Sequence, residues 1–187
     1  AGINPVEVEV ATKFVTRHHD VIATLAAISR LEHCDWGIDS SRGEVLDLPH
    51  VMLMSQTQDF LIASATLTLE KGDHAPAAVS LATSLRMAQH VRAGYPHIFP
   101  VDMCVHWFTL AGTRARQALA NNTFDAADRA ELWHALRRSL GQDPFGFRDM
   151  IALERRFRSN DLNKWRTTGI SGRLEWMKFV ETAASAQ

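Results

Sequence analysis

The stretch ASATLTLEKGDHAPAAVSLATSLRMAQ, residues 63–89, decides the fold expected for this chain. Two segments with helical periodicity meet at the tripeptide KGD, 71–73, where glycine favours the end of one helix and aspartate the start of the next. Small side chains beside this turn would let the two helices cross closely around a leucine. These positions are Ala65, Ala77, Leu81 and Ser84. The stretch therefore predicts a tight helical hairpin.

The hairpin resembles one unit of the tetratricopeptide repeat. The proline that often closes such a unit is replaced by Gln89. A weaker echo lies at 110–137, where Asn122-Thr123 stand for the turn and Ala127 for a small residue. Because this echo is offset by 50 residues, and not by the repeat's usual length of about 34, we predict a tetratricopeptide-like helical fold that is not a regular array.

Helical periodicity extends outward from this hairpin in both directions. One long helix is expected from Asn4-Pro5 to about residue 32, with an apolar stripe at Phe14, His18, Ile22, Leu25 and Ile28. Strand patterns are nearly absent. The other predicted helices cover 49–71, 73–94, 101–121, 125–140, 148–158, 160–168 and 173–184. The expected architecture is all-α: one domain, 1–187, of antiparallel hairpins in a tetratricopeptide-like stack with C-terminal capping helices.

Composition excludes a strong global charge. The 187 residues include 20 Lys and Arg against 21 Asp and Glu, which leaves no general attraction for nucleic acid or membranes. The signs are distributed unevenly: residues 1–50 carry four basic and eight acidic side chains, and residues 148–178 carry eight basic and four acidic ones. We therefore expect an acidic end and a basic end.

The cellular location is addressed by the cysteines and by the start of the chain. Cys34 and Cys104 are far apart and form no C-x-x-C motif, so no zinc site or disulfide framework is indicated, and a single bridge between them stays open. No apolar run is long enough to cross a bilayer. The chain begins with Ala1 and not Met, so a leader or membrane anchor before it stays open as well, and cytoplasmic and exported locations are both compatible.

A second resemblance covers about residues 33–95. CDWGID at 34–39, Gly43, LPHV at 48–51 and the KGD hairpin follow the same order as in uncharacterised bacterial helical proteins, which are often exported or membrane-anchored. This resemblance implies a helical fold and no activity.

The connector HCDWGIDSSRGEVLDLPHV, 33–51, is rich in potential ligands. A zinc site is one hypothesis for it, but the spacing follows no closed-site pattern. We favour a loop tied to the core, in which Trp36 packs inward, Gly37 and Gly43 take positive φ, Asp47 caps the next helix and His50 bonds to loop backbone.

A second group of potential ligands follows the hairpin. Asp102 and His106 are four residues apart on a predicted helix, so they share a face that His90 or His97 could approach. Such a group would suit a metal ion or a carboxylate-oriented imidazole, whereas the structural alternative is a helix-start carboxylate and a core histidine. No nucleophile elbow, phosphate loop or H-E-x-x-H motif accompanies it.

The basic segment 154–179 interleaves Arg and Lys with Phe157, Trp165, Trp176 and Phe179. This pattern is compatible with single-stranded nucleic acid or an anionic membrane surface, but we expect its apolar side chains to close the end of the stack.

Three functional hypotheses follow. The first is a non-enzymatic interaction module that binds a protein or peptide partner without any cofactor, in a groove near 58–92 lined by Gln58, Ser64, Thr68, Arg86 and Gln89. The second is a metal-binding protein or metal-assisted hydrolase that uses Asp102 and His106 with His90 or His97. The third is a helical pocket for an apolar small molecule or lipid, to which the six Met residues could adapt.

Overall fold

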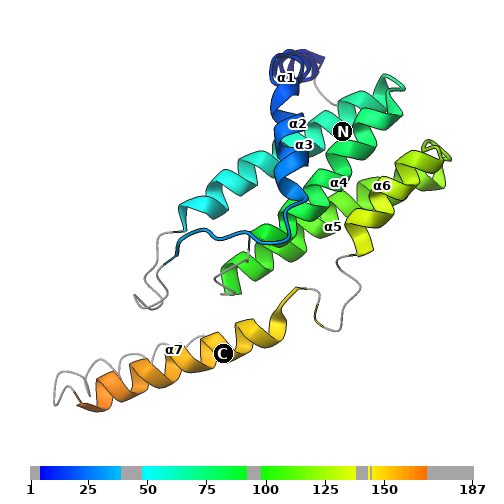
Figure 1. Ribbon diagram of the computed structural model, residues 1–187. Helices are drawn as coiled ribbons and strands as arrows, with labels where there is room; N and C mark the ends of the chain where they lie inside the picture. The colour runs from blue at the N-terminus through cyan, green and yellow to red at the C-terminus, as the bar shows by residue number, and fades with distance from the viewer. Residues whose placement is uncertain (1–4, 39–47, 92–97, 138–142, 144, 168–187) are drawn as a thin grey trace.

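The computed structural model describes residues 5–38, 48–91, 98–137, 143 and 145–167 (Figure 1). Within these residues all regular secondary structure is α-helical, which confirms the predicted class. The helices are α1 (Pro5–Arg17), α2 (His19–Ser29), α3 (Pro49–Glu70), α4 (His74–His90), α5 (Ile98–Ala120), α6 (Ala126–Arg137) and α7 (Phe147–Thr167). No helix in this part of the chain is long and apolar enough to span a membrane.

The α3–α4 hairpin forms as predicted around Gly72. Gly72 has φ +79°, a left-handed backbone conformation. Glycine adopts it without steric cost because it has no Cβ. The main-chain N–H of Asp73 donates to the oxygen of Thr68 at 2.8 Å, and that of Gly72 donates to Leu69 at 3.1 Å. These two bonds form a Schellman motif, which satisfies the last carbonyls of α3.

The predicted echo of this turn is also present. Asn122 has φ +53°, and the N–H of Thr123 donates to Ala118 at 3.1 Å, as Asp73 does to Thr68. Ala127, however, is exposed, so it is not a point of close helix approach. Instead α6 packs mainly on α4, with Leu132 and Ala135 buried in the same cluster as the alanines of α4 and α5.

Helix α4 is the centre of the bundle. It packs against α2, α3, α5 and α6, and every residue from Ser80 to Ala88 is buried (Figure 1). The small residues predicted for the α3–α4 crossing, Ala65, Ala77 and Ser84, are at most 1% exposed. Short side chains therefore let several helices approach one rod at once. The tetratricopeptide-like course of the stack stays a prediction.

Two predicted helix limits are wrong. The long helix expected over 4–32 breaks at His18 into α1 and α2, and Phe14 and Ile28 of its apolar stripe are 55% and 43% exposed. Helix α7 runs through Asn160 without the expected interruption, since one asparagine costs less than about 1 kcal/mol inside a helix. The expected helix 173–184 lies outside the described residues, as do the side chains of Phe157 and Trp165.

Helix α7 lies apart from the other six (Figure 1). Its main contact is with α5. A series of aromatic rings joins the two helices: the ring centroids of Phe108 and Phe145 are 5.4 Å apart, and those of Phe145 and Phe147 are 6.1 Å apart. The side chains expected to close the end of the stack are outside the described ones, so this closure stays a prediction.

Candidate functional site

A cavity of about 670 Å³ lies where α1 and α2 meet the α3–α4 hairpin. Most of its wall is apolar, and its size falls in the range of about 300–1,000 Å³ that is usual for small-molecule sites. Helix α1 contributes Thr12, Val15 and Thr16, and α2 contributes His19, Ile22 and Ala23. The opposite wall consists of Ser64, Leu67, Thr68 and Lys71 from the α3 side and Asp73, Ala75, Pro76, Val79 and Ser80 from the α4 side.

The chain changes direction at His18, beside this cavity (Figure 1). Helix α1 packs on α3 and helix α2 packs on α4, so the lining residues before and after His18 come from helices that contact different arms of the hairpin. His18 has φ −113° and ψ 25°, and its N–H donates to both Phe14 and Val15 at 3.2 Å. Asp20 lies in the first turn of α2, where the helix dipole favours a negative charge.

Two buried hydroxyl groups lie in the wall of the cavity. The Oγ atoms of Ser64 and Ser80 are 3.3 Å apart, and both residues are 1% exposed. Beside them, the Thr68 hydroxyl donates to the Ser64 main-chain oxygen at 2.8 Å and approaches that of Ala65 at 3.1 Å. The Thr68 proton is therefore used within α3, and the serine pair is the buried polar element of the wall.

The titratable lining residues lie at the rim. Lys71, Asp73 and His19 are exposed, whereas Leu67 is buried and Val79 and Ile22 are half-buried. A ligand inside the cavity would therefore meet apolar and hydroxyl groups, with charge only at its outer edge.

Two of the five predicted groove residues line this cavity. These are Ser64 and Thr68. Gln58 is fully buried, donates to the Ser84 main-chain oxygen at 3.1 Å and accepts a hydrogen bond from the Ser84 hydroxyl. It joins α3 to α4 and lines no accessible groove, contrary to expectation. Gln89 is half-buried near the end of α4 and does not line the cavity.

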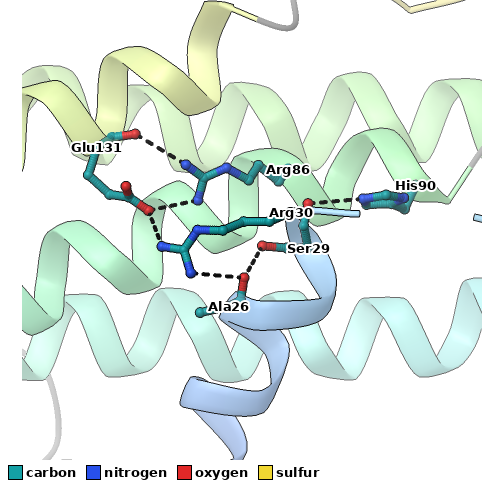
Figure 2. Close-up of polar contacts among 6 residues, drawn as sticks. All are labelled: Ala26, Ser29, Arg30, Arg86, His90 and Glu131. Carbon is teal, nitrogen blue, oxygen red and sulfur yellow. Dashed lines mark hydrogen bonds and ion pairs between the residues drawn. The ribbon is translucent and has the colours of Figure 1, made fainter. Parts of the chain in front are cut away.

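Arg86, the remaining predicted groove residue, is 5% exposed and serves the interior (Figure 2). Its guanidinium donates to the carboxylate of Glu131 at 2.9 Å, and Arg30 donates to the same oxygen at 2.7 Å. Burial by itself would raise the pKa of Glu131, but the hydrogen bonds from Arg86 and Arg30 outweigh it and hold that pKa below its usual value. One carboxylate thus joins α2, α4 and α6, and the expectation that Arg86 faces a partner is wrong.

The proposed metal ligands that the structure describes are not brought together. His90 is buried, and its Nε2 lies 3.1 Å from the main-chain oxygen of Ser29 (Figure 2). Asp102 and His106 share one exposed face of α5, as predicted, and His97 lies outside the described residues. Across the described ranges no three His, Cys, Asp or Glu side chains are grouped as a metal site would need.

The first half of the connector is tied to the core, as we expected. Trp36 donates from Nε1 to the main-chain oxygen of His90 at 2.7 Å and stacks on His50 with ring centroids 4.9 Å apart. Nε2 of His50 lies 3.2 Å from the oxygen of Val91, so this ring binds the end of α4 and not the loop backbone that we predicted. Together Trp36 and His50 satisfy carbonyls that the end of α4 leaves open.

The other connector predictions have mixed outcomes. Gly37 has φ +62°, as expected. Gly43, Asp39 and Asp47 lie outside the described residues, and α3 begins after Leu48 without a side-chain cap. Cys34 and Cys104 are not joined by a disulfide bridge. Burial, with a smaller effect from Asp35, raises the pKa of Cys34, which disfavours the reactive thiolate.

Sequence reasoning missed the walls contributed by α1 and α2. The available signal was the polar group His18-His19-Asp20 inside an otherwise apolar stripe, which is compatible with a new helix start. Comparison of the chain with protein-family models, with curated proteins and with solved structures found no match.

Proposed function

We propose that this protein is a non-enzymatic binding protein whose cavity between α1, α2 and the α3–α4 hairpin holds an apolar small molecule or acyl chain. The observation that carries this proposal is the cavity itself, with its volume of about 670 Å³ and its mainly apolar wall. Burial of apolar ligand surface there would supply about 25 cal/mol for each Å² removed from water.

The wall does not favour a reaction. Its titratable residues, His19, Lys71 and Asp73, are exposed at the rim, whereas its buried polar groups are serine hydroxyls. A serine hydroxyl needs an adjacent base to become a nucleophile, and the hydrogen-bond partner of each of these hydroxyls is the other serine. Binding without chemistry is the function that this arrangement supports best.

A matched pair of substitutions tests the proposal. Ala23 is an exposed residue of α2 that lines the cavity, and Ile28 is an exposed residue of the same helix that does not. The two positions are about 140° apart around the helix, so the Ala23→Trp indole can fill the cavity and the Ile28→Trp indole is directed away from it. Protein purified from its native cells is analysed by native mass spectrometry and by extraction of bound lipids. We expect an apolar compound with the wild type and with Ile28→Trp, and its loss from Ala23→Trp. Equal occupancy in both variants would contradict the proposal.

A second candidate function is binding of a partner's peptide or helix along the exposed face of α1. It is favoured by two apolar side chains that lie one turn apart on this helix, Val10 and Phe14, which are 62% and 55% exposed. Neighbouring apolar side chains on a surface are typical of protein contacts. A pulldown compares wild type with Phe14→Ser, and a partner retained equally by both would count against this candidate.

A further inference from the structure

We infer that the cavity selects a neutral ligand that carries a hydrogen-bond acceptor, such as a ketone, ester or ether oxygen, and places that oxygen against the Ser64–Ser80 pair. This inference rests on the proposed binding function and adds the chemical class of the ligand.

One of the two hydroxyl protons of the serine pair has no hydrogen-bond acceptor among the described residues. Each hydroxyl carries one donor proton, and the single contact between the two oxygens, at 3.3 Å, uses only one of them. No other described group accepts a hydrogen bond from either hydroxyl, and both residues are 1% exposed. A buried donor without an acceptor is costly, so an acceptor in the cavity would be stabilised there.

The neighbouring hydroxyl, that of Thr68, makes its own hydrogen bonds within α3 and none to the serine pair. The Thr68 proton is directed to main-chain oxygens of α3 at 2.8 and 3.1 Å. The serine pair is therefore the donor that the buried wall offers to a ligand.

The charge distribution argues for a neutral acceptor. An ionised carboxylate at the serine pair would need a cation nearby to offset its loss of water. The lining cation Lys71 is exposed at the rim and lies seven residues beyond Ser64 on the α3 side, a separation of about 10 Å along a helix. A carbonyl or ether oxygen carries no such requirement.

Two probes of the same shape isolate the effect of the acceptor. They are 4,4′-difluorobenzophenone and bis(4-fluorophenyl)methane. The first has a carbonyl group between its two rings, and the second has a methylene group there. Their affinities are measured by fluorine NMR titration on the wild type and on Ser64→Ala/Ser80→Ala. Both serines must be replaced, because a single remaining hydroxyl would still have a free proton. Alanine suits both helices, and far-UV circular dichroism checks that the fold is kept.

We expect the ratio of ketone affinity to hydrocarbon affinity to fall about fivefold in the double variant, the factor that one net hydrogen bond supplies. The hydrocarbon should bind both proteins about equally. An unchanged ratio with both compounds bound would overturn the role of the serines and leave the cavity as a binding site. Failure of both compounds to bind the wild type would contradict the proposed function itself, and this inference with it.

Discussion

Arg86 of α4 and Glu131 of α6 are joined at two points: Nη1 of the arginine lies 2.9 Å from a carboxylate oxygen, and Nη2 lies 3.5 Å from the glutamate main-chain oxygen. Arg30 reaches the same carboxylate oxygen from the exposed side (Figure 2). The two arginines thus bind one acid from environments that differ greatly, because the Arg86 side chain is 5% exposed and that of Arg30 is 52% exposed.

This difference predicts unequal losses of stability. Arg86→Gln leaves Glu131 without its buried partner and should lower the free energy of unfolding by about 2–3 kcal/mol. Arg30→Gln removes an exposed ion pair and should lower it by only about 0.2–1 kcal/mol. Urea denaturation followed by circular dichroism measures both. Similar losses for the two variants would show that burial does not decide the strength of this contact.

Removal of the indole N–H at the connector should loosen the end of α4. Trp36→Phe keeps an aromatic ring against His50 but leaves the main-chain oxygen of His90 without its 2.7 Å donor, at an expected cost of about 1–2 kcal/mol. Trp133→Phe, at a side chain that is 55% exposed, is the control and should change stability by less than about 0.5 kcal/mol. Thermal unfolding compares the two, and an unchanged melting temperature for Trp36→Phe would refute the connector's role.

Acid should destabilise the fold through His50. Burial lowers the pKa of this ring below 6.5, against a smaller opposing effect of its bond to Val91. The unfolded chain therefore binds more protons than the folded one as the pH falls below 6.5, so stability decreases in that window. Unfolding free energies measured between about pH 5 and 7 should depend less on pH in His50→Gln than in the wild type. His134→Gln, at an exposed ring, is the control; a pH dependence equal in all three proteins would contradict this assignment.

Two glycines should respond to alanine with opposite signs. Gly72 has φ +79°, so Gly72→Ala strains the hairpin turn and should cost about 1–2 kcal/mol. Gly112 lies inside α5, and a Cβ added there would meet nothing within 4 Å, so Gly112→Ala should stabilise by about 0.5–1 kcal/mol. Chemical denaturation of the pair provides an internal control. Two changes of the same sign would mean that the local backbone does not govern either position.

The hairpin was predictable because its signals are local. A glycine followed by aspartate, with small residues at helical spacing, determines a turn and a close crossing without reference to the rest of the chain. The same holds for the turn at Asn122, which repeats the hydrogen bonds of Gly72. Both turns were therefore located correctly from residue types alone.

The candidate site was less predictable because its parts are distant in sequence. Ser64 and Thr68 line the cavity, but its opposite wall comes from residues on both sides of the break at His18, where the sequence predicts one continuous helix. Arg86 was misplaced because a charged residue on a helix is usually solvated, and its partner Glu131 lies 45 residues away. Pairing over such distances leaves no periodic signal in the sequence.

The enclosure of α4 has a consequence for how such a protein could have arisen. In a linear solenoid, a copied hairpin can be added at either end, because each unit touches only its neighbours. Here α2, α3, α5 and α6 all pack on α4, whose residues from Ser80 to Ala88 are buried. A copied α3–α4 hairpin could not stack on these enclosed turns without displacing a helix that already packs there.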